Sequence, residues 1–191
     1  MRVASSRRWP VWLSLAFFSL SASACSPRRL IINSMANALT SGTSSLGTED
    51  DPELILDALP FALISLESLA ESAPNHEGLR LTLASGFVQY AYAESDLSAE
   101  LVKYENYERF RALQDTARKR YLRGKRWGME GLELRHPGLE AALSRDPAEA
   151  VKVLTAEDVP LLYWTGAGWL GAISISVDRV ALLAQLPQAA A

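Results

Sequence analysis

The fold of this chain is decided by residues 97–121, LSAELVKYENYERFRALQDTARKRY. Apolar side chains recur in this stretch at steps of three and four residues, the spacing that places them on one face of an α-helix. These positions are Leu97, Leu101, Tyr104, Tyr107, Phe110, Leu113, Ala117 and Tyr121. The pattern predicts one long amphipathic helix.

Further helices are predicted on both sides of this stretch. Residues 79–93 repeat the helical spacing, and the polar pair Ser95-Asp96 is expected to end that helix. On the other side, a separate helical run is predicted over residues 125–135, and His136-Pro137-Gly138 is expected to stop it.

The ends of the chain show helix signals as well. Asp50-Asp51-Pro52-Glu53 resembles an N-cap with proline in the first turn, which opens a helix over residues 54–72. Thr155-Ala156-Glu157-Asp158 resembles a capping box, which opens a helix over residues 161–176. A helix is also predicted within residues 30–39, and shorter ones over residues 139–143, 147–154 and 180–186. Because no convincing strand pattern interrupts these signals, the chain is predicted to be all-α.

The order of small and bulky residues is typical of tetratricopeptide (TPR) repeats, whose period is about 34 residues. Small residues in such repeats lie where two helices touch, and bulky residues fill the space between them. Three segments follow this order, marked by Ala62, Leu66, Leu69 and Pro74, by Leu83, Ala84 and Phe87, and by Leu162, Thr165, Gly166 and Trp169. The sequence therefore predicts antiparallel helix pairs stacked as a TPR-like helical repeat array.

The N-terminus resembles an export signal. Arginines precede an apolar run over residues 11–20, and small residues then lead to Cys25 in the sequence LSASAC. A cysteine in this position is where bacterial lipoproteins receive their lipid. Ala22-Ser23-Ala24 also fits an ordinary signal-peptidase site, so secretion without lipid remains an alternative. The apolar run is too short for an uncleaved membrane anchor, which needs roughly 20 residues.

This interpretation divides the chain into three parts. Residues 1–24 form a lipoprotein signal peptide. Residues 25–48 form the lipidated N-terminus with a short helix and a flexible Ser/Gly loop. Residues 49–191 form the TPR-like domain. The residue after Cys25 is Ser26 and not an aspartate, which would hold a lipoprotein at the inner membrane. The expected location is therefore the periplasm of a Gram-negative host, where lipid on Cys25 anchors the protein to the outer membrane.

Composition excludes several classes of function. Without the signal, 16 basic residues stand against 22 acidic ones, a formal net charge of −6, which disfavours nucleic-acid binding. A single cysteine excludes a disulfide framework and a cysteine metal site. His76 and His136 are too few for a His-rich metal site, and each is expected to be a turn or capping residue. No catalytic motif is found, so neither a cofactor nor an enzymatic activity is expected.

Several segments together resemble a known family. They are Ser41-Gly42-Thr43, Glu49-Asp50-Asp51-Pro52-Glu53, Ala58-Leu59-Pro60, the run LELRHPG at residues 132–138 and the run EDVPLLYWTG at residues 157–166. On these residues the chain resembles the T-component family of TRAP transporters, the periplasmic TPR-like lipoproteins of tripartite ATP-independent transport systems. The resemblance is strongest in the last segment and covers nearly all of the chain after the signal.

The resemblance implies partners and a ligand. The expected partner is the periplasmic solute-binding P-component of a TRAP transporter, and the expected ligand is a small apolar or amphipathic acid. Family members run further beyond residue 186, so the chain is expected to be a short member or a shortened gene product. Incomplete covering of a repeat array favours self-association, and a homo-oligomer is therefore expected.

Two groups of residues are candidate functional sites. The first is a basic cluster, in which Arg118, Arg120, Arg123 and Arg126 form a candidate docking patch for an acidic partner or for anionic lipid headgroups. The alternative for this cluster is a solvated helix face. The second is an aromatic and glycine-rich helix, in which Tyr163, Trp164, Gly168 and Trp169, together with Trp127, form a candidate ligand channel. The alternative for this second group is core packing.

Two functions follow from these features. The first is an accessory protein of a TRAP transporter, anchored by lipid, that binds the P-component and a ligand. The second is a general TPR-type scaffold lipoprotein in outer-membrane assembly, without a role in solute transport.

Overall fold

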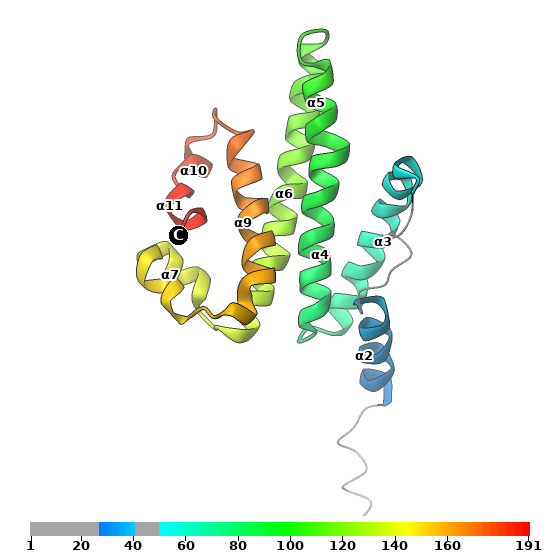
Figure 1. Cartoon of the computed structure of the whole chain (residues 1–191), viewed down its shortest axis with the longest axis vertical. Helices are drawn as coiled ribbons and strands as arrows, with labels where there is room; N and C mark the ends of the chain where they lie inside the picture. Colours follow the sequence, from blue (N-terminus) through cyan, green and yellow to red (C-terminus); the bar gives the residue numbers. More distant parts are fainter. Residues whose placement is uncertain (1–26, 41–49) are drawn as a thin grey trace, which may run out of the picture.

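The computed structural model describes residues 27–40 and 50–191, and every regular element in this part of the chain is helical (Figure 1). The elements are α2 (Pro27–Thr40), α3 (Pro52–Ser72), α4 (Glu77–Tyr90), the π-helix η2 (Ala91–Asp96), α5 (Leu97–Val102), α6 (Tyr107–Arg135), α7 (Leu139–Arg145), α8 (Pro147–Ala150), the 3-10 helices η3 (Val151–Val153) and η4 (Ala156–Asp158), α9 (Val159–Ser174), α10 (Val180–Leu183) and α11 (Leu186–Ala189). The all-α prediction is confirmed. Cys25, the signal and the Ser/Gly loop lie outside the described residues.

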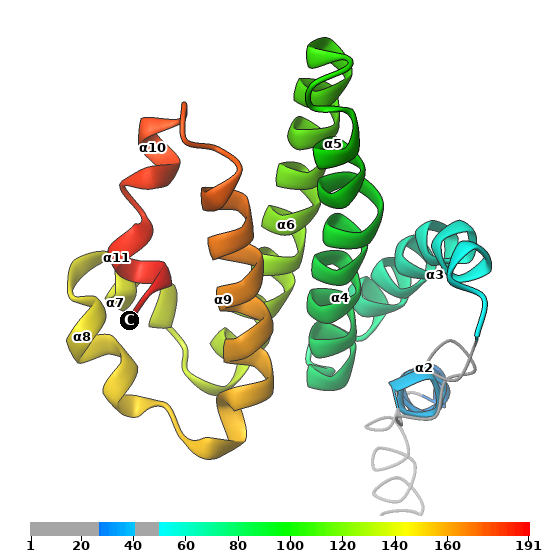
Figure 2. The same ribbon diagram turned by 45° about the horizontal axis from the view of Figure 1, so that its top comes forward.

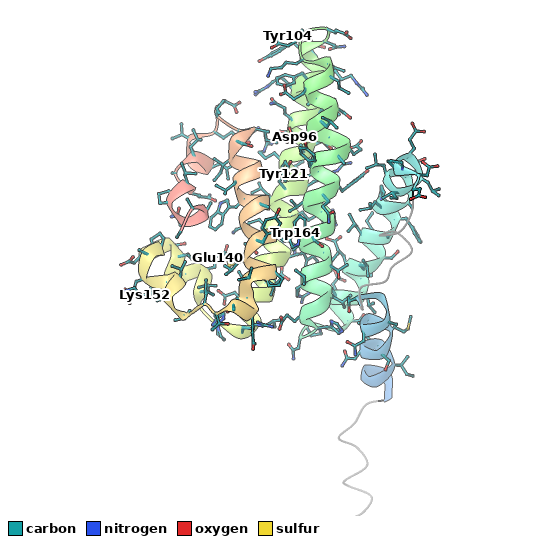
Figure 3. The ribbon with its side chains drawn as sticks, in the orientation of Figure 1. Asp96, Tyr104, Tyr121, Glu140, Lys152 and Trp164 are labelled. Carbon is teal, nitrogen blue, oxygen red and sulfur yellow. The ribbon has the colours of Figure 1, made fainter. Side chains whose placement is uncertain are left out.

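A long helical hairpin forms the centre of the molecule. Its first arm consists of α4, η2 and α5 without interruption, and α6 returns beside this arm (Figure 1). The turn between the arms places Tyr104 at the far end of the hairpin, where this side chain is 94% exposed (Figure 3). The hairpin provides the surfaces on which the remaining helices pack.

The predicted helix break at Ser95-Asp96 is wrong. The chain stays helical there as a π-helix, because both polar side chains find partners on α6 instead of competing for the backbone. Arg120 donates to the hydroxyl of the fully buried Ser95, and the Tyr121 hydroxyl donates to Asp96 Oδ2 at 2.9 Å (Figure 3). The residues expected to end the helix thus join the two arms of the hairpin.

The predicted single helix over residues 97–121 is also wrong. A turn at residues 103–106 divides it, because the Asn106 side chain accepts a hydrogen bond from the amide of Arg109 at 3.0 Å and starts α6 as a new helix. The helix expected separately over residues 125–135 is the continuation of α6, which ends at Arg135 as predicted.

Helices α9, α4 and α6 approach one another closely where glycines face a neighbouring backbone. A Cβ atom on Gly168 of α9 would lie 2.8 Å from the Tyr121 carbonyl oxygen of α6, and a Cβ atom on Gly124 would lie 3.0 Å from the Ala84 carbonyl oxygen of α4. Neither position has room for a side chain, so glycine sets the distances between these helices.

Two hydrophobic cores lie on opposite sides of the hairpin. Helices α2 and α3 cover one side of α4, and their core includes Leu63, Leu83 and Trp127. Helix α9 covers the other side and carries the short helices α7, α8, α10 and α11 on its outer face (Figure 2). The core on this second side includes Leu161 and Trp169.

The TPR-like repeat arrangement is not confirmed. A repeat of about 34 residues contains two helices and their turns, whereas α6 alone has 29 residues. The antiparallel pairing of α4 with α6 follows from one long hairpin, in which the same alternation of small and bulky residues also produces close packing.

Asp158 joins the end of α6 to the start of α9. Its buried carboxylate, with 1% of the side chain exposed, accepts hydrogen bonds from the Thr155 amide at 2.8 Å and from the Thr155 hydroxyl at 3.0 Å. Arg135 Nη1 lies 3.1 Å from Oδ1, and His136 Nε2 lies 3.0 Å from Oδ2. These hydrogen bonds hold the pKa of Asp158 well below its ordinary value, and the one from the Thr155 amide has the largest effect.

Asp158→Asn is expected to lower the free energy of unfolding by about 3 kcal/mol at pH 7, because it removes a buried charge and replaces one of the two acceptor oxygens with an NH2 group that faces a donor. Because the pKa of the folded carboxylate lies below the unfolded value of about 3.9, its contribution is present at neutral pH and is lost as the pH falls below about 4. Urea unfolding from pH 7 to pH 3 should therefore show a smaller loss of stability in the variant than in the wild type. Glu157→Gln, at a neighbouring exposed carboxylate, is the control, and equal pH profiles for Asp158→Asn and the wild type would contradict this role.

Candidate functional site

A large apolar cavity lies between α9 and the short helices on its outer face. Its volume is about 780 Å³. Helix α9 forms one wall, α6 and α7 contribute leucines, and the segment around α11 closes a further side. The lining residues are Met129, Leu132, Leu139, Leu143, Val151, Leu154, Thr155, Ala156, Val159, Leu162, Tyr163, Thr165, Gly166, Ala167, Trp169, Leu170 and residues 188–191.

The lining chemistry suits an apolar molecule. No charged side chain is present among the described residues that line the cavity, and the polar side chains apart from Tyr163 and Trp169 are Thr155, Thr165 and Gln188. The Thr165 hydroxyl already donates to the Leu161 carbonyl at 2.6 Å. A volume of this size with an apolar lining is typical of sites for small molecules.

The structure divides the five residues of the candidate channel. Tyr163 and Trp169 line the cavity, whereas Trp164, Gly168 and Trp127 do not. The division follows from helix geometry, since residues 163, 166 and 170 share one face of α9 and residue 168 faces α6. Trp127 belongs to the core on the opposite side of the hairpin.

Each of the three residues away from the cavity has a contact elsewhere in the fold. Gly168 lies against the α6 backbone. The ring of Trp164 meets that of Tyr163 edge to face, with 4.9 Å between the ring centres. The Trp127 indole N–H donates to Glu67 Oε1 at 2.7 Å.

Trp169 is held in the cavity wall by polar contacts at its rim. Its indole N–H donates to Gln185 Oε1 at 2.9 Å, and Lys125 Nζ lies 4.3 Å from the ring centre. Lys125 in turn lies 2.5 Å from Glu140 Oε1. These contacts fix the orientation of a large aromatic surface toward the cavity.

Sequence reasoning missed the aliphatic part of the cavity. Leu139 and Leu143 lie four residues apart on α7, and Leu162 and Leu170 lie on α9 beside the predicted aromatics. The spacing of Leu139 and Leu143 indicates a helix face that must be covered, and this signal could have pointed to them.

The four arginines of the candidate docking patch do not form one surface. Arg118 pairs with Asp115, Arg120 with Glu94, Arg123 with Glu67, and Arg126 with Glu130 at 2.8 Å. The side chains of Arg118 and Arg120 are 14% and 23% exposed, whereas those of Arg123 and Arg126 are 44% and 51% exposed. A partner in solution can therefore reach Arg123 and Arg126 most readily.

Both histidines have structural contacts. His76 is the N-cap of α4, with Nδ1 accepting from the Leu79 amide at 3.2 Å, and His136 contacts Asp158 at the end of α6. Among residues 27–40 and 50–191, no cluster of three or more His, Cys, Asp and Glu side chains is arranged to hold a metal ion.

Comparison with known proteins identifies the family. Residues 48–191 match the sequence model of the family described as TRAP transporter T-component. The chain belongs to this family. The resemblance inferred from the sequence is thereby confirmed, and T-components are accessory parts of transporters, not a known enzyme family.

A protein of Treponema pallidum (strain Nichols) is 31% identical to this T-component over 170 residues. It carries only the name "Uncharacterized protein". The match covers 80% of this chain and 53% of that protein, so the T-component spans about half the length of this curated relative. Over the described residues of the T-component, we find no helix with the length and apolar character that a membrane span needs.

Gly168→Ala in this T-component is expected to lower the free energy of unfolding by about 1–3 kcal/mol, because the new methyl group would press on the backbone of α6. Gly166→Ala is the matched control, because no atom outside the local backbone of α9 lies within 4 Å of its Cβ position. The control should be neutral or slightly stabilising, since alanine is the better helix former. Urea unfolding of both variants measures the difference, and equal stabilities would show that α9 can move away from α6.

Proposed function

We propose that this T-component is a lipid-anchored periplasmic accessory protein of a TRAP transporter, which binds a small apolar or amphipathic ligand and docks the solute-binding P-component. The observation that carries the proposal is the apolar cavity of about 780 Å³ beside α9 in a member of this family. The family assignment favours transport over a general scaffold in outer-membrane assembly.

The cavity supports the ligand part of the proposal. Its lining offers aliphatic side chains and the two aromatic rings of Tyr163 and Trp169, so binding would be driven by the removal of apolar surface from water. No charged side chain among the described lining residues would pair with an ionised group. An amphipathic acid would therefore place its apolar part inside and its carboxylate toward solvent.

The partner part of the proposal rests on the exposed half of the arginine cluster. Arg123 and Arg126 lie on the same side of α6, near Glu67. Their pairing with carboxylates leaves about half of each side chain exposed. The P-component would meet this surface with acidic side chains, and the contact would be weakened by salt.

The anchoring part of the proposal rests on Cys25. Helix α2 begins at Pro27, two residues after this cysteine. Lipid attached to Cys25 would hold the start of α2 close to the outer membrane.

Gly166→Leu is expected to fill part of the cavity and to weaken binding of a fluorescent fatty acid by about tenfold or more, while the melting temperature changes little. Outside the local backbone of α9, the position has no atoms within 4 Å of a Cβ, so the new side chain enters the cavity without a backbone clash. Ala141→Leu, on the exposed surface of α7, is the matched control and should bind the fatty acid as the wild type does. Undiminished binding by Gly166→Leu would show that the ligand does not occupy this cavity.

Arg126→Ala is expected to weaken the complex with the purified P-component from the same organism by roughly fivefold at low salt, with a smaller effect at high salt. Arg118→Ala is the control, because its side chain is mostly buried and pairs with Asp115. Isothermal titration calorimetry measures both. A P-component affinity that is equally reduced in the two variants, or unchanged in both, would contradict docking at the exposed arginines.

A further inference from the structure

Arg80 of α4 is a buried arginine at the junction of α3, α4 and α6. Its side chain is 9% exposed. Nη2 donates to the Pro74 carbonyl at 2.9 Å, and the guanidinium lies over the Trp127 ring, 4.7 Å from its centre. A Cβ atom on Gly131 of α6 would lie 3.0 Å from Arg80 Cβ, so the glycine lets α6 close over the stem of the side chain. The guanidinium is therefore held in one orientation.

Two donor nitrogens of this guanidinium have no acceptor. Arg80 Nε and Nη1 are both buried and make no hydrogen bond. Glu130 Oε2 lies 3.6 Å from Nε, which is too far for a hydrogen bond. Burial consequently lowers the pKa of Arg80 from its ordinary value. Buried charged donors without acceptors are unfavourable, so an acceptor that came within hydrogen-bond distance of Nε would be bound favourably.

The carboxylates around Arg80 are already engaged elsewhere. Glu67 accepts from Arg123 and from the Trp127 indole, and Glu130 Oε1 accepts from Arg126 at 2.8 Å. The charge of Arg80 is thus the one left without a hydrogen-bonded counterion in this group.

A hollow of about 290 Å³ lies beside this charge. It is lined by Arg80, Arg123, Arg126, Glu67, Glu71, Glu130, Trp127, Ala70 and Pro74. Glu71 is exposed, and solvent therefore screens its charge.

We propose that Arg80 is the recognition group of a second binding site, which takes a compact carboxylate at Nε, in the place beside this nitrogen where Glu130 Oε2 lies at 3.6 Å. Three arginines and three glutamates line the hollow, so a carboxylate that takes the place of the Glu130 side chain leaves the charges of the site balanced. A phosphate would bring more negative charge next to Glu67, Glu71 and Glu130. The volume of the hollow, about 290 Å³, limits the ligand to a small molecule.

Entry of the ligand requires a small displacement of Glu130. This side chain is 39% exposed and is held by an i,i+4 pair with Arg126, which is itself 51% exposed. Such exposed pairs are weak, so Glu130 can turn outward and leave its place to the incoming carboxylate. Glu130 and the ligand therefore compete for Arg80.

The site is separate from the apolar cavity. Trp127, Arg80 and Glu67 line the hollow between α3 and α6, whereas Tyr163 and Trp169 line the cavity on the outer side of α9. A variant that no longer binds a fatty acid in the apolar cavity should still bind a small carboxylate at Arg80. A variant that no longer binds the small carboxylate should still bind the fatty acid.

The test is a titration of the purified protein with propionate at constant ionic strength. The readout is the indole N–H signal of Trp127 in a nitrogen–proton correlation spectrum, assigned with Trp127→Phe. Propionate should shift this signal saturably in the wild type, whereas propionamide and phosphate should not. Arg80→Met should weaken propionate binding by about tenfold or more. Glu130→Gln should strengthen it, because the competing charge is gone. Arg145→Met, at an exposed arginine of α7, is the control and should bind as the wild type does.

Several outcomes would overturn the proposal. They are the absence of a saturable shift, an equal response to propionamide, a stronger response to phosphate, an unchanged affinity in Arg80→Met, and weaker binding in Glu130→Gln. If circular dichroism shows that Arg80→Met does not fold, Arg80→Lys replaces it, and its smaller set of donors should also weaken binding. Glu130→Gln alters a partly exposed side chain and should fold normally. Its effect on propionate binding therefore tests the proposal independently of the two Arg80 variants.

Discussion

The close approach of α6 to its two long neighbours is the constraint on which this structure depends. Gly124 lies against α4, and Gly168 of α9 lies against α6, so both helix interfaces include points where a glycine meets the backbone of the neighbouring helix. Contacts of this kind tolerate little change in distance. The orientation of α9 follows from them, and with it the directions in which Tyr163 and Trp169 point.

Electrostatics supports the same arrangement. Helix α6 carries all four arginines of the basic cluster. Glu67 of α3 and Glu94 of η2 pair with two of them, and acids of α6 itself pair with the other two. The basic cluster therefore acts mainly through ion pairs within the molecule. Its inner pairs are shielded from solvent, and only the outer arginines remain available to a partner.

Local signals in the sequence predicted local structure. The cap at Asp51 forms two hydrogen bonds to the first turn of α3, and Asp158 reaches back to Thr155 as the capping-box pattern indicated. One error was local, because the cap formed by Asn106 on the amide of Arg109 divides the expected helix over residues 97–121. The other errors arose where the partner is distant in sequence. Ser95 is retained in a helix by Arg120, and the outcome for Arg123 depends on Glu67, which is 56 residues away. For the cavity, the aromatics Tyr163 and Trp169 were predicted, but the approach of α7 to α9 depends on tertiary packing that no local pattern contains.

The two sides of the cavity differ in their mechanical properties. Helix α9 is braced along its inner face by the α6 backbone, and it cannot retreat without breaking that contact. The opposite side consists of α7 with seven residues and of α8 and α11 with four residues each. Short helices of this kind have few backbone hydrogen bonds of their own and depend on the surfaces beneath them. The cavity therefore has a rigid wall, formed by α9, and a deformable wall, formed by the short helices. A bulkier ligand would be accommodated by outward movement of the short helices, with the central hairpin left undisturbed.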